Sequence, residues 1–309
     1  MKNMLAPSLI ALGIATPVFA AGIAMDDQSQ LVPKPAADGH AAQAVFTPPA
    51  ERELPDNAFG KLVKEGRAIF VDTRNLAAEY VGNGMNCTNC HLEQGRKADS
   101  APLWGAYPMY PAYRSKNDKV NSYVERMQGC FQFSMNGEAP PADSHVLNAL
   151  TAYSYWLSTG APTGKELPGR AYPNVPQPKG GYDIARGKEI YATQCAICHG
   201  DNGEGQKSGD DYVFPPLWGK DSFNWGAGMH RINTAATFIK ENMPLGQGRS
   251  LTDDEAWHVA AFMNSHERPQ DPRLVNGSIE ETRLRYHAND GVNLYGVKVN
   301  GVLLGQGTD

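Results

Sequence analysis

The pentapeptide CTNCH at residues 87–91 returns as CAICH at residues 195–199. C-x-x-C-H is the pattern by which c-type haem is attached to a polypeptide. Its two cysteines add to the porphyrin vinyl groups as thioethers, and the adjacent histidine binds the iron as the proximal ligand. The sequence therefore predicts two covalent haems, with attachment residues Cys87, Cys90, Cys195 and Cys198 and proximal ligands His91 and His199.

Two other uses of a cysteine pair fit the sequence less well. A thioredoxin-type redox pair needs no histidine directly after it. A zinc site needs further Cys or His residues at ligand spacing, and these are lacking here.

The sequence around each motif follows one order: an amphipathic segment, the cysteine pair, a Met-containing loop, and a closing segment with apolar residues at helical spacing behind a Ser, Thr or Asp start signal. This duplication predicts an all-α protein with two cytochrome c-type domains, at residues 55–163 and 183–273. Residues 164–182 hold four prolines and four glycines, which predicts an extended linker.

Both ends of the chain differ from this pattern. Residues 1–20 carry one lysine, an apolar stretch and a small-x-small ending, typical of a secretory signal cut after Ala20. We expect a flexible leader at 21–54 and an exported, periplasmic protein without a membrane span. The tail at 274–309 is Gly- and Val-rich, with strand-like character and turn signals at NDG and NG, and it suggests no function.

Composition excludes one class of partner. The chain has 309 residues, a formal charge of −5 and a pI of about 5.9. A nucleic-acid-binding protein usually carries a basic excess, so we expect no nucleic acid. A small anion remains a candidate ligand, because a local basic pocket can lie on an acidic protein.

Methionine is the usual distal partner of histidine in such cytochromes. Met243 lies 44 residues after His199, in an MPLG loop, and is favoured over its competitor Met229. Pro244 stiffens the backbone beside it. Met263 lies within the amphipathic closing segment and is expected in the core.

The first domain offers two distal ligands, and the residues alone leave the choice open. Met135 lies 44 residues after His91, so the repeat nominates it. Cys130 is the one cysteine outside the two motifs. If residues 119–134 are helical, Arg126, Cys130 and Ser134 share one face and Met135 points about 140° away from Cys130. Alternatively, Cys130 is a small buried hydrophobe.

A basic cluster precedes Cys130 and contains Arg114, Lys116, Lys119 and Arg126. Nearby cations favour a thiolate, and they also attract a small dianion. A solvated charged face explains the same pattern equally well.

Several longer segments resemble the dihaem thiosulfate dehydrogenases: PLWGAYPMYPAYR, ERMQGCFQFSMNGEAPP, YSYWLSTGAP, VFPPLWG, FNWGAGMHRINTAA and SHERPQDPR. The similarity runs from about residue 55 to 273. It implies a periplasmic enzyme that couples two thiosulfates to tetrathionate and passes two electrons to an acceptor cytochrome or similar carrier.

The resemblance also implies roles for single residues. The active haem of that family has His and Cys axial ligands, which here are His91 and Cys130, so the resemblance overrules the nomination of Met135. Arg126 and Ser134 fall at positions lining the substrate site, with Arg114, Lys116 and Lys119 as substrate-binding candidates. Met243 matches the distal ligand of the second haem. Some relatives have a lysine beside that methionine, where this chain has Asn242.

Three rival functions use the same motifs. A plain dihaem electron carrier would have two His/Met haems and no basic pocket. A tetrathionate reductase would use the same residues in the opposite direction, since direction depends on haem potentials. A haem subunit that processes a sulfur carrier would need a partner chain.

Overall fold

The computed structural model describes residues 45–114 and 117–308. The predicted signal, residues 21–44 of the predicted leader and the candidate Lys116 lie outside this part of the chain. The described residues are mainly helical, with three small two-stranded antiparallel sheets. This confirms the predicted all-α class.

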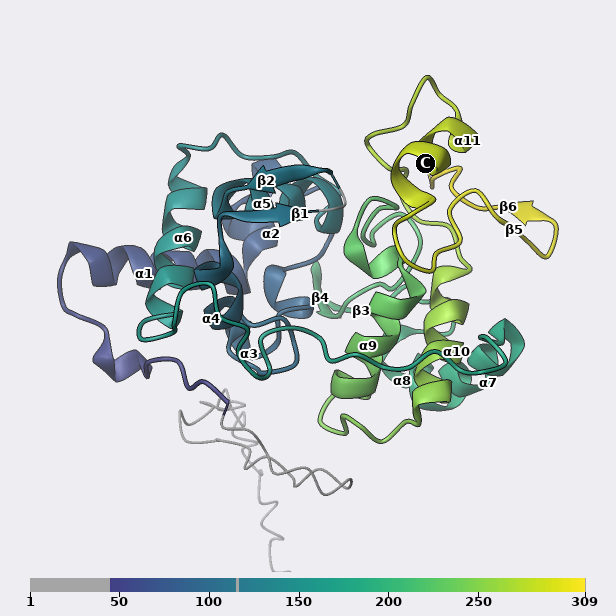
Figure 1. The fold of residues 1–309 in the computed structure, drawn as a ribbon, viewed down its shortest axis with the longest axis horizontal. Coiled ribbons are helices and arrows are strands. Elements are labelled where there is room, and N and C mark those ends of the chain that lie inside the picture. The colour runs from purple at the N-terminus through teal and green to yellow at the C-terminus, as the bar shows by residue number, and fades with distance from the viewer. Residues whose placement is uncertain (1–44, 115–116, 309) are drawn as a thin grey trace, which may run out of the picture. The chain divides into compact units, whose positions relative to one another are not determined.

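The first domain contains seven main elements (Figure 1): α1 (Ala58–Val71), α2 (Thr73–Leu76), α3 (Leu92–Gly95), α4 (Leu103–Ala106), α5 (Tyr123–Gly129), the π-helix η5 (Cys130–Ser134) and α6 (His145–Leu157). It also has 3-10 turns at Glu51–Glu53 (η1), Ala78–Tyr80 (η2), Cys87–Asn89 (η3) and Tyr107–Met109 (η4), and a hairpin of β1 (Ala112–Arg114) with β2 (Lys119–Asn121).

The second domain repeats the order with α7 (Ile184–Gln194), α8 (Ala196–His199), the hairpin of β3 (Gln206–Ser208) and β4 (Asp211–Phe214), the 3-10 turn η6 (Gly228–His230), α9 (Ile232–Asn242) and α10 (Asp253–Asn264). The tail adds α11 (Ile279–Thr282), the π-helix η7 (Arg283–His287) and a hairpin of β5 (Lys298–Val299) with β6 (Val302–Leu303).

The predicted start signals cap the helices. The Ser144 hydroxyl accepts from the backbone N–H of Leu147 before α6, and the Thr252 hydroxyl forms a capping box with Glu255 before α10. In each domain the first helix then packs on the last: α1 on α6, and α7 on α10. These two helix pairs contribute buried core residues such as Val63, Leu147 and Trp257.

One segment differs from the expectation of a single helix over residues 119–134. Residues Lys119–Asn121 pair with β1, and a capping box between Ser122 and Glu125 starts α5 only at Tyr123. From Cys130 the hydrogen bonds lengthen to the i+5 spacing of a π-helix, as in the bond from the Met135 N–H to the Cys130 carbonyl at 3.0 Å.

Residues 45–54 pack more closely than a flexible leader would. The ring of Phe46 lies 5.5 Å from that of Trp104, and Arg96 donates to the Pro49 carbonyl at 2.9 Å. An apolar ring that can be buried against the domain explains the difference. The linker 164–182 has no helix or strand in the structure, but its Val175 is buried and accepts from the Trp257 indole at 3.2 Å.

The tail packs on the second domain. The predicted NG turn joins β5 to β6, with positive φ at Asn300 (49°) and Gly301 (84°), as a two-residue hairpin turn requires. Tyr295 is fully buried, with its ring 5.7 Å from that of Trp225. Glu267 accepts from the backbone N–H groups of Gly305 and Gln306.

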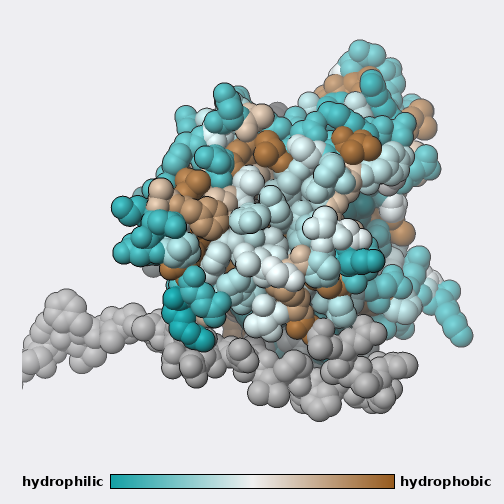
Figure 2. All heavy atoms as spheres, turned by 60° about the vertical axis from the view of Figure 1, so that its left-hand side comes forward, coloured by the Kyte–Doolittle hydropathy of each residue, from teal (hydrophilic) through white to brown (hydrophobic). Residues whose placement is uncertain are grey.

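The surface contains both hydrophobic and hydrophilic residues. On the face drawn in Figure 2, hydrophobic residues form small separate patches among hydrophilic ones. None of the helices in the described ranges is long and apolar enough to cross a lipid bilayer.

The helix crossings generate a stability prediction. A Cβ at Gly66 would lie 2.0 Å from the Ala149 carbonyl oxygen, and one at Gly187 would lie 2.0 Å from that of His258. Each Gly→Ala change should therefore destabilise the holoprotein by about 1–3 kcal/mol, although alanine is the better helix former. Denaturant unfolding measures this, with Gly180→Ala, where a Cβ meets no atom within 4 Å, as the control. Unchanged or increased stability in both variants would contradict the close crossing.

Candidate functional site

The first cysteine pair lies in and after the 3-10 turn η3. No disulfide joins any of the five cysteines, all of which lie in the described residues, so the pair is available to a haem. The hydroxyl of Thr73 contacts both the side chain and the backbone of Cys87. It donates to Sγ at 3.2 Å and accepts from the Cys87 N–H at 3.1 Å. Burial raises the pKa of Cys87 and of Cys90 to about 12. Both side chains are therefore neutral thiols before they react with the haem vinyl groups.

The histidine of each motif is held by a backbone carbonyl. His91 Nδ1 lies 2.7 Å from the oxygen of Ala101, and His199 Nδ1 lies 2.9 Å from that of Pro215. Because a carbonyl can only accept, Nδ1 carries the proton and Nε2 presents its lone pair. Burial lowers the pKa of both imidazoles, which keeps them neutral. Both features are those of a metal-binding histidine, so the two motifs fit c-type haem.

Cys130 lies beside the first motif. It begins η5, and Arg126, one turn earlier on α5, donates from Nη1 to its Sγ at 2.9 Å. Burial is the main cause of the raised pKa values of Cys87 and Cys90, and the nearby sulfur of Cys130 raises both of them further. Burial lowers the pKa of His91, the hydrogen bond to the Ala101 carbonyl opposes this shift, and the positive charge of Arg126 lowers the pKa further. The structure thus brings Arg126, Cys130 and the first motif together.

The rival ligand Met135 lies in the hydrophobic core with 3% of its surface exposed. Its N–H donates to the Cys130 carbonyl, and its own carbonyl accepts from Gly82 at 2.9 Å. A regular α-helix through Met135 was the basis for the angle of about 140°, and the π-turn replaces that helix.

Ser134 ends the same π-helix, but the contact that the structure shows for it is made by its backbone. Its carbonyl accepts from the Asn83 amide at 2.9 Å, and the same amide donates to Ser222 in the second domain at 3.1 Å. Asn224 adds a bond to the carbonyl of Gln132 at 2.9 Å. Residues of the second domain therefore fix the position of η5.

The upstream basic residues divide into two cases. Arg114 is exposed and donates to the Tyr110 hydroxyl at 3.0 Å. Lys119, opposite it in the hairpin, forms an ion pair with Glu125 at 2.5 Å. Hydrogen bonds from Lys119 and from the Ser122 N–H lower the pKa of Glu125 to about 2. Because Glu125 already neutralises Lys119, Arg114 is the stronger candidate for an anionic substrate.

Three tyrosines near Cys130 were not predicted as site residues from the sequence. Burial raises the pKa of Tyr123 and of Tyr172, and in both the charge of Cys130 adds to the shift. Tyr110 lies edge-on to Tyr123, with ring centroids 5.5 Å apart, and its hydroxyl accepts from Arg114. Tyr110 belongs to a motif that carried the resemblance, whereas Tyr172 lies in the linker and gave no signal.

The second domain has two methionines that could bind the iron of its haem, and both pack against its core. Met243 directly follows α9, Met229 lies in η6, and both are partly buried. Met263 is 6% exposed in α10, which confirms its predicted place in the core. Asn242 is fully buried and donates to the carbonyl of Asp99 at 3.1 Å.

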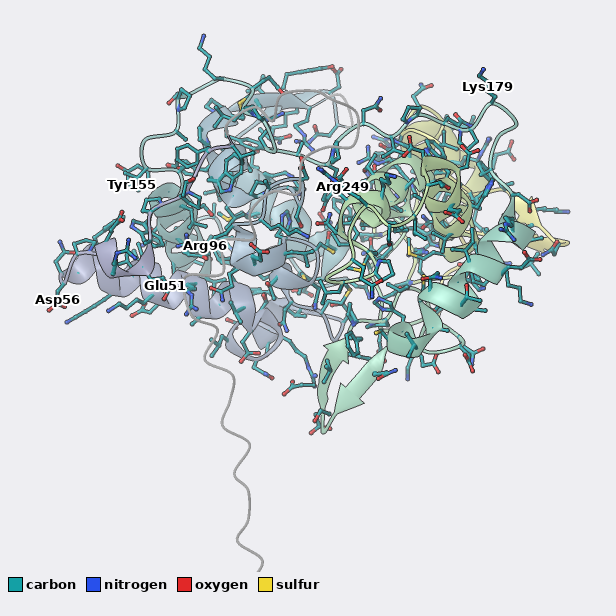
Figure 3. The ribbon with its side chains drawn as sticks, turned by 90° about the horizontal axis from the view of Figure 1, so that it is seen from below. Glu51, Asp56, Arg96, Tyr155, Lys179 and Arg249 are labelled. Atoms are coloured by element: carbon teal, nitrogen blue, oxygen red, sulfur yellow. The ribbon has the colours of Figure 1, made fainter. Side chains whose placement is uncertain are left out.

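Arg249 (labelled in Figure 3) adds a further link between the domains. It forms ion pairs with Glu241 at 2.5 Å and Asp99 at 3.3 Å. Together with the bond from Asn242 to Asp99, it connects the end of α9 to the loop that carries Ala101, the acceptor for His91.

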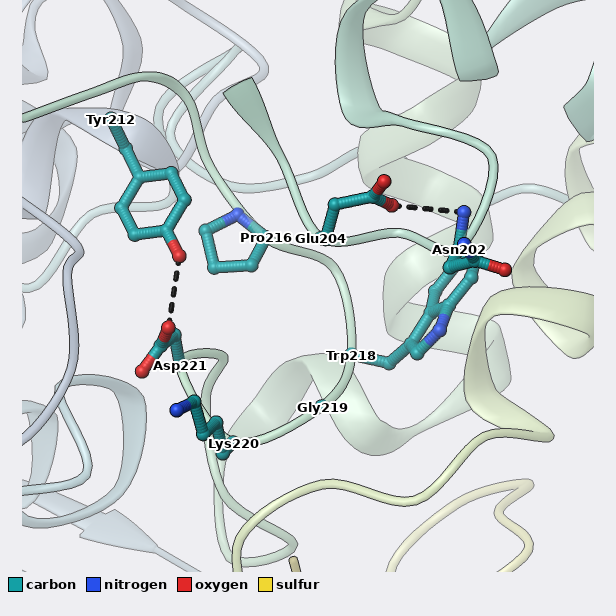
Figure 4. Close-up of a pocket in the computed structure, with 8 residues that line it drawn as sticks. All are labelled: Asn202, Glu204, Tyr212, Pro216, Trp218, Gly219, Lys220 and Asp221. Atoms are coloured by element: carbon teal, nitrogen blue, oxygen red, sulfur yellow. Dashed lines mark hydrogen bonds between the residues drawn. The ribbon is translucent and has the colours of Figure 1, made fainter. Parts of the chain in front are cut away.

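A pocket of about 210 Å³ in the second domain is separate from these groups (Figure 4). Tyr212 donates to Asp221 at 3.0 Å on one side of it, and Glu204 accepts from the Asn202 N–H at 2.9 Å on the other. None of the site residues predicted from the sequence lines it, so we do not assign it to the candidate site.

Comparison with known proteins finds two cytochrome c domains in this chain. The family model described as SoxA/TsdA, cytochrome c domain, matches residues 77–163, and the one described as cytochrome C oxidase, cbb3-type, subunit III, matches residues 183–263. Both are cytochrome models, so the chain carries two covalently bound c-type haems.

Two curated relatives share one description. Thiosulfate dehydrogenase of Stutzerimonas stutzeri (strain A1501) is 75% identical over 307 residues, 99% of each chain. Thiosulfate dehydrogenase of Thiomonas intermedia (strain K12) is 52% identical over 96% of this chain and 94% of the relative.

A solved structure, the thiosulfate dehydrogenase TsdBA from Marichromatium purpuratum in its as-isolated form, matches with a TM-score of 0.82 and 49% identity. The match covers 85% of this chain and 58% of that longer one. With these identities over nearly its whole length, the chain belongs to the thiosulfate dehydrogenase family.

Proposed function

We propose that this chain oxidises two thiosulfates to tetrathionate at Cys130, beside the first haem, and passes the electrons through the second haem to an acceptor cytochrome or similar carrier. The observation that carries the proposal is the 2.9 Å contact between Arg126 Nη1 and Cys130 Sγ next to the first C-x-x-C-H motif. The family relationship supports thiosulfate as the substrate.

In this proposal Cys87 and Cys90 attach the first haem, and His91 and Cys130 bind its iron. Cys195 and Cys198 attach the second, and His199 and Met243 bind its iron. In both histidines Nδ1 is held by a backbone carbonyl, which leaves the Nε2 lone pair for a metal and supports these assignments. The burial of Met135 in the core favours Cys130 over it as the distal ligand.

Arg126 has two tasks in the reaction. Two thiosulfate dianions repel each other, and a guanidinium both offsets that charge and donates directed hydrogen bonds to sulfonate oxygens. Its bond to Cys130 also stabilises a thiolate, the nucleophilic form of the side chain. In this proposal Arg114 attracts the incoming dianion; its exposure and its bond to Tyr110, the neighbour of Tyr123, support that role.

The sulfur of Cys130 divides the coupling into two steps. In the first, a bond forms between its Sγ and the sulfane sulfur of one thiosulfate, and two electrons leave. In the second, the sulfane sulfur of another thiosulfate displaces Sγ, so that tetrathionate departs and Cys130 returns as a thiolate. The two bound haems supply acceptors for the two electrons, one each.

The rival functions fit less well. The identity to dehydrogenases over almost the whole chain disfavours a plain electron carrier. The same identity favours net oxidation over tetrathionate reduction. Haem attachment, together with the predicted signal at residues 1–20, supports a periplasmic location.

Replacing Cys130 tests the proposed reaction centre. In Cys130→Met the thioether can still bind iron, so the first haem should stay low-spin with a higher potential. It cannot form the adduct, so thiosulfate-dependent ferricyanide reduction should fall by orders of magnitude. Met135→Leu, a change of similar volume in the core, is the control and should retain activity. Near-normal turnover in Cys130→Met would make the thiol merely structural.

Replacing Arg126 tests its charge. A hydrogen bond to a charged group contributes about 1.5–3 kcal/mol, so Arg126→Gln should lower kcat/KM for thiosulfate about 10- to 100-fold. The matched control is Arg186→Gln on α7, where the arginine side chain is 55% exposed. Equal losses in the two variants would show a general charge effect and count against the role of Arg126.

Replacing Met243 tests the electron exit. Met243→Gly should lower the potential of the second haem, while thiosulfate still reduces the first. A spectroscopic redox titration measures both, with Met229→Leu as the comparison. If Met229→Leu shifts the potential and Met243→Gly does not, Met229 is the ligand.

A further inference from the structure

Three buried side chains meet where the tail packs on the second domain. His230 ends η6, His287 ends η7, and Asp290 follows three residues later. Their exposed fractions are 0%, 2% and 7%. One potential ligand atom from each lies within 4.8 Å of the other two. None of these residues has a part in the proposed oxidation of thiosulfate.

The outer hydrogen bonds fix the tautomer of each imidazole. His230 Nδ1 lies 2.5 Å from the carbonyl oxygen of Ala227, which can only accept, so Nδ1 carries a proton and Nε2 a lone pair. His287 Nε2 lies 2.9 Å from the carboxylate of Asp271.

Asp271 remains ionised. Arg273 pairs with its carboxylate through two hydrogen bonds, from Nη2 to Oδ2 at 2.6 Å and from Nε to Oδ1 at 2.9 Å. A carboxylate at this distance accepts, so the proton of His287 is on Nε2 and its Nδ1 carries the lone pair. An imidazole whose other nitrogen is held by a carbonyl or carboxylate is the usual arrangement around a protein-bound metal.

The two lone-pair nitrogens face each other. His230 Nε2 and His287 Nδ1 are 3.2 Å apart. Moving the proton of either ring to make a neutral N–H···N bond would leave a bare nitrogen against Ala227 or Asp271. A cation between the nitrogens removes this conflict. Two Zn–N bonds of about 2.0–2.1 Å at a tetrahedral angle place their nitrogens about 3.3 Å apart, close to the observed separation.

Asp290 supplies an oxygen on the same side. Its Oδ2 lies 3.8 Å from His230 Nε2, while Oδ1 pairs with Arg231 Nη1 at 3.1 Å. Arg231 thereby orients the carboxylate toward the two histidines. The ring of Tyr295 stacks on His287 at 4.0 Å and 17°, and Trp225 lies edge-on to His230 at 6.2 Å. These contacts hold both imidazoles in place.

We propose that His230, His287 and Asp290 bind one divalent transition-metal ion, with zinc as the best match, which ties the C-terminal tail to the second domain. Two imidazoles and a carboxylate are a zinc-binding set, and a water molecule would complete the tetrahedron. Because His230 and His287 are 57 residues apart, an ion shared by them closes a long loop and stabilises the folded tail.

Metal analysis of the holoprotein tests the proposal. The protein is treated with a chelator, dialysed against dilute zinc and then against metal-free buffer, and its zinc and iron are counted. Haem iron gives the protein concentration, and about one zinc for every two irons is expected. His287→Gln and Asp290→Asn should lose it. The control His145→Gln, which removes a histidine whose side chain is 68% exposed, should keep it.

Thermal unfolding of the wild-type protein gives a second readout that needs no variant. Zinc should raise the transition temperature until about one equivalent is bound, and a chelator should reverse the rise. The proposal is overturned if the wild type retains no more zinc than His287→Gln. If that variant does not fold, the contradicting result is a wild type that retains no zinc and shows no thermal shift. The cation between the two nitrogens would then be a proton.

Discussion

A single hydrogen bond in each domain sets the orientation on which haem binding depends. The carbonyls of Ala101 and Pro215 hold Nδ1 of His91 and His199, so each Nε2 lone pair faces away from its own backbone contact. The helix pairs α1–α6 and α7–α10 support the two loops, and Gly66 and Gly187 allow the helices to approach. Both domains thus present a neutral, fixed imidazole beside a cysteine pair.

The domains differ in the candidate for the second iron ligand. In the first, η5 follows α5, and Arg126 contacts the sulfur of Cys130. In the second, α9 ends at Asn242 and Met243 follows it, in an MPLG motif that contains no arginine. A thiolate beside a cation suits reaction with a dianion, and a neutral thioether suits electron transfer. The duplicated fold thereby supports two different tasks.

Local signals in the sequence predicted much of this arrangement. The C-x-x-C-H motifs, the caps at Ser144 and Thr252 and the NG turn are short-range patterns, and the structure has the caps and the turn where they were expected. The repeat nominated Met135 rather than Cys130, because residue spacing does not show that the helix changes to π geometry. Only the family resemblance favoured Cys130.

Contacts between distant segments gave no such signal. Tyr172 in the linker, Asn83 bridging to Ser222, and the meeting of His230 with His287 depend on how the two domains and the tail pack. Residues 45–54 were predicted as part of a flexible leader because residues 21–52 are rich in Ala, Pro and Gln, yet the ring of Phe46 packs on that of Trp104. Packing overrides composition where one apolar side chain can be buried.

The central claim is that Cys130 carries the substrate covalently. The most direct measurement is peptide mass spectrometry of the holoprotein after brief exposure to tetrathionate without an electron donor. Reversal of the second step should leave one thiosulfate group on the peptide that contains Cys130, and excess thiosulfate should remove it. An active preparation in which the Cys130 peptide stays unmodified under these conditions would contradict the account.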